Sequence, residues 1–208
     1  MAAAHRATHQ TAELARQYGV VNAPGAELYI AALVTRLLQS YPQRTTAIES
    51  HRVVLLRTLE PIAVAPGNNT LVVSRGLLLQ LSNEAELAFI LAHELAHELL
   101  GHTLELERSP ESRRAFELAA DRFGLGLVAL AGYDPRPATQ ALAHLQRMND
   151  LWAMDLNYPD FTSRLASLQT AIYASHWQPP GTINRRDFQK LHATLCNYPP
   201  RATGGVCG

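Results

Sequence analysis

The sequence lacks the features that mark several common classes of protein. Its 18 basic and 18 acidic residues cancel, so the chain has no long-range positive field of the kind that attracts nucleic acid. No run of 18 or more apolar residues occurs, whereas a membrane-spanning helix needs about 20. We therefore expect no nucleic-acid partner and no integral membrane segment.

Cysteine is scarce, since only Cys196 and Cys207 occur and both lie in the C-terminal tail. No G-x-S-x-G sequence is present either, so neither a serine nor a cysteine nucleophile is indicated. The tail between the cysteines has little to bury, and a disulfide closing it would contribute roughly 2 to 3 kcal/mol. Such a bond requires an oxidising compartment such as the periplasm. Two free thiols are the alternative.

The N-terminus lacks the apolar core of a secretory signal. Residues 1–6 fit either a cytoplasmic chain or a mature secreted chain that was given a starting methionine for expression. The two cysteines favour the second interpretation. We expect a periplasmic protein, with a cytoplasmic one as the alternative.

Only 17% of the residues are charged, against 47% hydrophobic, and 208 residues suffice for one good core. Neither a linker nor a repeat is evident. We expect a single domain over residues 1–208, with an N-terminal helical segment (1–48), a core (50–175) and a C-terminal helix and tail (176–208). Periodicity predicts helices over 24–39, 83–102, 134–149, 160–176 and 184–195, and a β-rich run over 51–58. The fold class is therefore α+β, mainly α.

One motif carries chemistry: residues 93–97 read His-Glu-Leu-Ala-His. Residues four apart share one face of a helix, so His93 and His97 can grip one metal ion while Glu94 stands beside them. Apolar residues recur at helical intervals around the motif, Ser82 or Asn83 can cap the start of the helix, and Gly101 offers a stop. Chance alone gives such a motif in about 2% of chains of this composition, so further ligands are needed.

A second helix begins at Ser109 and Pro110 and would run antiparallel to the first. In such a hairpin, residues at equal distance from the turn lie at the same height along the two helices. This places His97 opposite Glu117 and His93 opposite Asp121. We predict Glu117 as the third ligand and Asp121 as the carboxylate that accepts the ring N–H of His93. His102 lies nine positions after His93, roughly half a turn from the metal face, so it is not a predicted ligand.

These residues predict a site for one Zn²⁺ per chain, held by two histidines and one glutamate with water in the fourth position. Zinc would activate the water and Glu94 would act as general base, without a covalent intermediate. A purely structural zinc would need a fourth protein ligand, and none is evident. A tail thiolate that caps the zinc is the remaining alternative.

Four segments carry a family resemblance: HELAHELLGH, the upstream VSRGLLLQLSNEAELAFILA, the downstream FELAADRFG, and AGYDP. Together, within roughly residues 50–175, they resemble the gluzincin metallopeptidases of the CAAX-prenyl-endopeptidase-like family, which includes the HtpX-like and BepA-like bacterial quality-control proteases. The resemblance implies a zincin-like domain, with an edge strand over the active-site helix and a helical lower half. It also implies ligands His93, His97 and Glu117, catalytic Glu94 and supporting Asp121.

The family commonly has a later His-Pro pair and an arginine six positions after that histidine, near the substrate carbonyl. Here Tyr158 replaces the histidine, and Arg164 is the arginine. Tyr158 could stabilise the oxyanion, with Arg164 assisting or holding nearby carboxylates. The structural alternatives are a helix-entry aromatic for Tyr158 and a surface salt bridge for Arg164.

Two further segments bear on the substrate. In related enzymes an edge strand pairs with extended substrate, and we place that strand at 70–73, after the segment 60–67 that differs from the family's pattern. The loop 148–160, unusually apolar, is either a lid over the cleft or a hydrophobic plug. Four isolated histidines are read as surface or packing residues: His51, His144, His176 and His192.

The function that follows is a zinc metalloendopeptidase that acts on unfolded or misassembled polypeptides, as the resemblance implies. The alternative is a chaperone or adaptor that keeps the fold and metal but works mainly by binding clients. The oligomeric state stays open.

Overall fold

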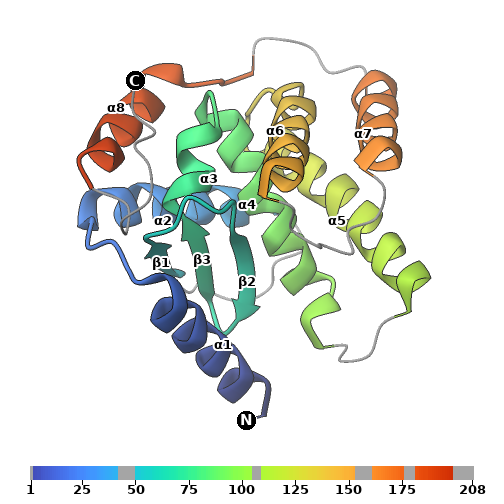
Figure 1. The fold of residues 1–208 in the computed structure, drawn as a ribbon. Helices are drawn as coiled ribbons and strands as arrows, with labels where there is room; N and C mark the ends of the chain where they lie inside the picture. Colours follow the sequence, from blue (N-terminus) through green and yellow to red (C-terminus); the bar gives the residue numbers. More distant parts are fainter. Residues whose placement is uncertain (1, 42–49, 105–108, 153–160, 176–180, 199–208) are drawn as a thin grey trace.

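The computed structural model describes residues 2–41, 50–104, 109–152, 161–175 and 181–198. In chain order these residues form α1 (Ala2–Tyr18), α2 (Pro24–Gln39), β1 (Arg52–Leu56), β2 (Ala63–Gly67), β3 (Thr70–Ser74), α3 (Arg75–Gln80), α4 (Glu84–Leu99), the 3₁₀ helix η1 (His102–Leu104), α5 (Pro110–Leu130), α6 (Pro137–Trp152), α7 (Phe161–Ala174) and α8 (Arg185–Cys196) (Figure 1). Helices dominate around one small sheet. The predicted α+β, mainly α class is confirmed.

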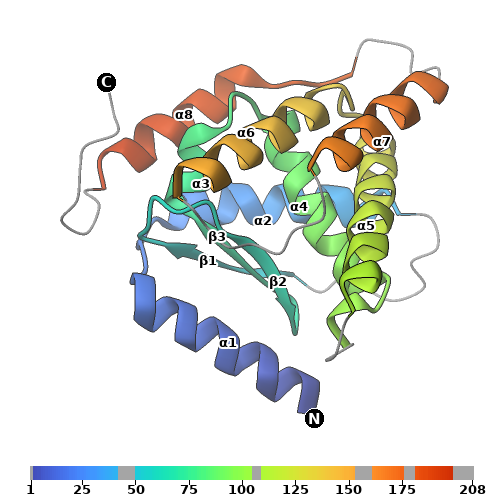
Figure 2. The same ribbon diagram turned by 45° about the vertical axis from the view of Figure 1, so that its right-hand side comes forward.

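The sheet has the order β1–β3–β2, with β1 parallel and β2 antiparallel to β3. The prediction that residues 70–73 form an edge strand is therefore wrong. All five residues of β3 are buried, as expected for a strand covered on both faces, and α1 lies on one face of the sheet while α2 and α4 lie on the other (Figure 2). The edge strand beside α4 is β2, which the sequence analysis treated only as a segment before the strand.

Helix α4 is the centre of the core. Its residues from Glu84 to His93 are all buried, and it packs against α2, α5, α6, α8 and β2. Asn83 caps its start by accepting a hydrogen bond from the N–H of Glu86 at 3.0 Å. The helix ends at Leu99, three residues before the predicted end, and Gly101 then takes a left-handed conformation with φ 76°. The chain can therefore turn sharply before η1.

Each predicted helix is present, with boundaries that differ by a few residues. Helix α3 was not predicted, because its six residues are too few to show a helical period. Helix α6 continues to Trp152, so the first five residues of the expected loop 148–160 are helical, and Met148 is buried. Residues 153–160 lie outside the described residues.

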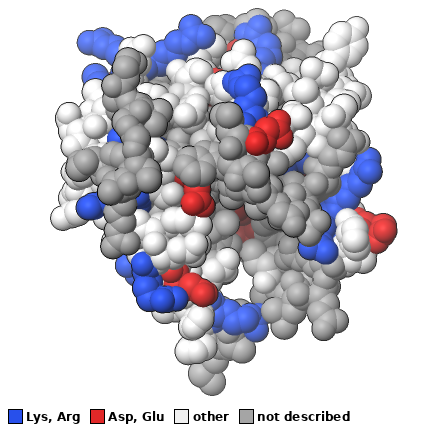
Figure 3. All heavy atoms as spheres, viewed as in Figure 1, with Lys and Arg blue, Asp and Glu red and all other residues white. Residues whose placement is uncertain are grey.

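The C-terminal end of α8 carries the disulfide-bonded Cys196. Its expected partner, Cys207, lies outside the described residues. None of the described helices is long and apolar enough to cross a membrane. Basic and acidic side chains both occur over the face shown in Figure 3.

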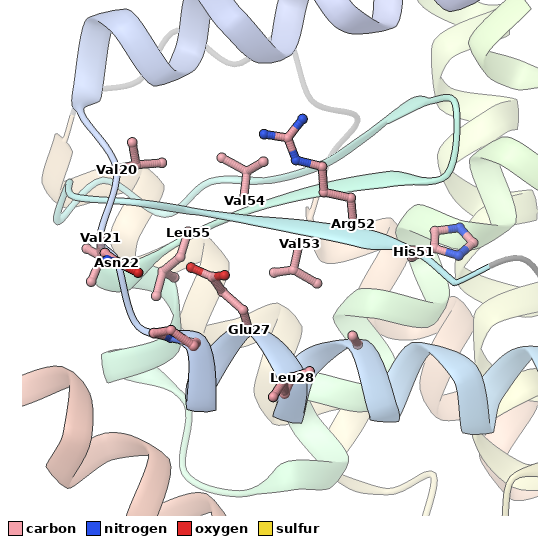
Figure 4. Close-up of a pocket in the computed structure, with 12 residues that line it drawn as sticks. Val20, Val21, Asn22, Glu27, Leu28, His51, Arg52, Val53, Val54 and Leu55 are labelled. Carbon is pink, nitrogen blue, oxygen red and sulfur yellow. The ribbon is translucent and has the colours of Figure 1, made fainter.

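A cavity of about 600 Å³ lies between α2 and β1 (Figure 4). Its lining comes from these two elements and from the segments next to them, and includes Glu27, Leu28 and Arg52, but no residue of α4 or α5. The cavity is therefore separate from the histidine motif.

Candidate metal centre

The ligand atoms of His93, His97 and Glu117 lie within 4.8 Å of one another. Among the described residues this is the group that could hold a metal ion. The Nε2 atoms of the two histidines are 3.1 Å apart. Each of them is 3.3 Å from one carboxylate oxygen of Glu117. Two imidazole nitrogens and a carboxylate thus converge on one point.

The donor set fits zinc. Nitrogen and carboxylate ligands are those that catalytic zinc sites use, with one position left for water. Oε2 of Glu117 is buried and accepts no hydrogen bond of good geometry from the described residues, although Nη1 of Arg164 lies 3.1 Å away. A cation between the three side chains would satisfy this oxygen.

Close approach of α4 and α5 brings the three candidate ligands together. Gly124 of α5 lies so near α4 that a Cβ atom there would be 3.0 Å from the backbone nitrogen of His93. One turn earlier on α5, Asp121 places Oδ1 3.0 Å from Nδ1 of His93. The structure therefore pairs His97 with Glu117 and His93 with Asp121, as the helical-hairpin geometry predicts.

Arg164 of α7 holds the two carboxylates of α5. Its guanidinium donates to both oxygens of Asp121, at 2.8 and 2.7 Å, and its Nη1 lies 3.1 Å from Glu117. The side chain is only 4% exposed, so the interpretation as a surface salt bridge is wrong. The described contacts correspond to the alternative in which the arginine holds nearby carboxylates.

The charges of the cluster shift its pKa values in opposite directions. Burial lowers the pKa of His93, but the adjacent carboxylates of Asp121 and Glu117 outweigh burial and raise it to about 9. Burial raises the pKa of Glu117, but the neighbouring rings of His93 and His97 outweigh it, so the pKa is lowered. The pKa of Asp121 is lowered in the same way, chiefly by Arg164. Both carboxylates are thereby kept ionised.

Glu94 lies next to this cluster and faces the sheet. Its Oε2 accepts a hydrogen bond from the backbone N–H of Ala65, on edge strand β2, at 3.2 Å. Burial raises the pKa of Glu94, while His93 and His97 oppose the shift. A raised carboxyl pKa suits a group that must take up and release a proton near neutral pH.

Several other candidate residues lie apart from the cluster. Nε2 of His51 is 3.6 Å from Glu98, Nδ1 of His144 is 3.1 Å from Glu86, and His192 donates to the carbonyl of Leu78 at 2.7 Å. Packing roles therefore fit these three histidines. Tyr158 and His176 lie outside the described residues.

One residue lies nearer to the cluster than the helical spacing predicted. His102 is buried, and its Nδ1 lies 3.1 Å from Nδ1 of His97. The prediction that His102 points away from the metal face was based on a helix that continues to residue 102. A glycine one position earlier was the available signal that the chain turns there.

Residues 24–109 match the model of peptidase family M48. The matched stretch contains the sheet and the HExxH motif but ends before Glu117. Together with the clustered ligands, the match supports a metallopeptidase role, and a peptidase of the M48 family acts on polypeptides. No curated protein matches the chain.

Proposed function

We propose that this chain is a zinc-dependent endopeptidase of the gluzincin type, related to the HtpX-like and BepA-like quality-control proteases. The observation that carries the proposal is the convergence of His93, His97 and Glu117 beside Glu94, whose Oε2 accepts a hydrogen bond from the edge strand β2. The M48 match over residues 24–109, which include the HExxH motif, also supports a metallopeptidase role.

In this proposal the two Nε2 atoms and the Glu117 carboxylate would hold one zinc ion. When bound, zinc polarises a carbonyl and lowers the pKa of a coordinated water from 15.7 toward about 7. Glu94 takes the proton from the attacking water and passes it to the leaving amine. Arg164 and Asp121 keep His93 and Glu117 in place during this transfer.

We place the extended substrate against β2 in place of residues 70–73. Among the described residues β2 has a strand partner on one side only, and Ala65 in its middle already contacts Glu94. A polypeptide added to that edge would bind through main-chain hydrogen bonds and so with loose sequence preference. Unfolded or misassembled proteins supply such extended segments.

We further propose that the protein works in the periplasm. The disulfide-bonded Cys196 supports this, since structural disulfides persist in oxidising compartments. Mass spectrometry of the protein isolated from its native cells under non-reducing conditions tests it. Recovery of two free thiols would favour the cytoplasm.

The test of catalysis is Glu94→Gln, with Glu111→Gln as its matched control because Glu111 is an exposed glutamate at the start of α5. We expect Glu94→Gln to lower kcat/KM on an unfolded substrate by about 10²-fold to 10⁴-fold. Zinc content, measured by elemental analysis, should stay at one per chain. The control should cleave at the wild-type rate.

The same variants separate the two functions considered from sequence. If zinc-loaded wild-type protein cleaves no unfolded substrate and Glu94→Gln keeps all biological activity, the chain works by binding clients and the endopeptidase proposal is wrong. Loss of activity in Glu94→Gln at full zinc content supports the endopeptidase.

A further inference from the structure

The ring of His97 has a second partner outside the ligand cluster. Its Nε2 faces Glu117, and its Nδ1 lies 3.1 Å from Nδ1 of His102. The ring centroids are 5.1 Å apart and the planes meet at 66°. Two ring nitrogens at this distance form a hydrogen bond only when one carries a proton and the other accepts it.

A local break in the helix brings His102 to this place. Helix α4 ends at Leu99, and Gly101 adopts φ 76°, a conformation in which other residues are strained. The chain then reverses and enters η1, which begins at His102. In a continuous helix His102 would point about half a turn away from the ligand face.

Packing from α5 holds the ring of His102. Phe116 stacks on it, with centroids 4.1 Å apart and planes 17° from parallel, and the imidazole is buried. Phe116 directly precedes Glu117 in the chain. The helix that supplies the third ligand thus also supplies the surface that orients His102.

We propose that His102 is a positioning residue for the metal centre, and that its Nδ1 accepts a hydrogen bond from the Nδ1–H of His97. This rests on the metal site of the proposed function. A ligand that binds through Nε2 keeps its proton on Nδ1, and the partner of that N–H sets the ring's tautomer and angle. Asp121 occupies the corresponding position for His93, at 3.0 Å.

The two ligands therefore have unequal partners. Asp121 is a carboxylate that accepts two hydrogen bonds from Arg164, whereas His102 must be a neutral imidazole with its proton on Nε2 in order to accept. A neutral acceptor orients His97 without adding a further negative charge to a cluster that already contains Glu117 and Asp121.

Three substitutions of His102 separate hydrogen bonding from packing. His102→Phe keeps a ring that stacks on Phe116 but cannot accept, His102→Gln restores an acceptor oxygen, and His102→Ala removes both. His192→Gln is the control, because it changes a histidine that bonds a backbone carbonyl on α3. Zn²⁺ affinity is measured by competition with a chromogenic chelator, and folding by the thermal melt of the metal-free protein.

We expect His102→Phe and His102→Ala to bind Zn²⁺ about 10-fold to 100-fold more weakly than wild type. His102→Gln should recover part of that loss, and His192→Gln should bind like wild type. In zinc-loaded wild type, the ¹⁵N shifts of His102 should be those of a neutral ring protonated on Nε2.

Wild-type affinity in His102→Phe, or a charged His102 ring in the NMR spectrum, would overturn the proposal. These measurements do not depend on peptide cleavage. If wild-type protein binds no Zn²⁺, or binds it equally after His93→Ala, the metal site itself is wrong and so is the proposed function.

Discussion

Buried charged side chains surround the candidate metal centre. Arg164 sits between Glu117 and Asp121, both largely shielded from water, and compensates the two carboxylates from one side. His93 completes the compensation from the other side. Removing one partner of such a set leaves an uncompensated buried charge, which is costly. The cluster is therefore preorganised by charge balance as well as by helix packing.

Asp134 is another buried carboxylate, outside the metal centre. It accepts from the backbone N–H of Arg136 at 2.9 Å and pairs with the same residue's guanidinium, an arrangement that precedes α6. The hydrogen bonds with that side chain are the main reason why the pKa of Asp134 is lowered. A lowered pKa means that the folded state favours the ionised carboxylate.

We predict that Asp134→Asn lowers the free energy of unfolding by about 1 kcal/mol at pH 7, a modest value because Arg136 is largely exposed. The contribution is present above the unfolded-state pKa of 3.8 and is lost as pH falls through the lower folded-state pKa. The difference in free energy of unfolding between wild type and variant should therefore shrink below about pH 4. Urea unfolding of both proteins between pH 7 and pH 3 measures it. A difference in free energy of unfolding that stays constant or widens in acid would contradict the stabilising pair of Asp134 with Arg136.

Among the elements, the contact of α4 with α5 determines the geometry of the site. Gly124 permits the contact, because a Cβ atom there would lie 3.0 to 3.2 Å from backbone atoms of Ala92 and His93. Gly126, two residues later on the same helix, faces open space. The two glycines thus offer a matched pair for testing how helix separation affects the ligands.

We predict that Gly124→Ala destabilises the protein by about 1 to 3 kcal/mol, since backbone atoms of α4 must move to admit the methyl group. It should also weaken Zn²⁺ binding, because His93 moves with its backbone. Gly126→Ala should instead stabilise by roughly 0.5 to 1 kcal/mol through helix propensity. Chemical unfolding and chelator competition on both variants provide the measurements. Equal zinc affinity in the two would show that the helix contact does not control the site.

At the scale of the whole molecule, metal binding and folding should be coupled. The candidate ligands come from α4 and α5, and α7 adds Arg164, so the complete site exists only when three helices are docked. A ligand that binds only the folded state stabilises it in proportion to its concentration over Kd.

We predict that Zn²⁺ at 100 times its Kd stabilises the fold by about 2.7 kcal/mol, which raises Tm by roughly 5 to 10 °C for a chain of this size. Chelation should reverse the shift. Scanning calorimetry with and without chelator measures it, with His97→Ala and Glu117→Ala as the variants that should lose it. If Zn²⁺ raises the Tm of those variants by the same amount, the ion binds at another site.

Local sequence patterns were sufficient to predict much of the structure of this protein. The HExxH spacing, the caps at Asn83 and Ser109, and the level pairing of two helices around a short turn depend only on neighbours in sequence and on helical geometry. The helix class and the cluster of His93, His97, Glu117 and Asp121 could accordingly be predicted. Glu117 could be predicted as the third candidate ligand because α4 and α5 are adjacent along the chain.

Tertiary structure decided what depends on distant residues or on a local break. The order of the sheet makes β3 central and β2 the edge, because strand neighbours are chosen by packing against α1, α2 and α4 rather than by chain order. Arg164 reaches Asp121 from a helix 43 positions away. The ring of His102 lies beside the ring of His97 only because the chain leaves the helix at Gly101. Sequence determined the chemistry of the centre, whereas the surroundings that orient it followed from how the elements pack.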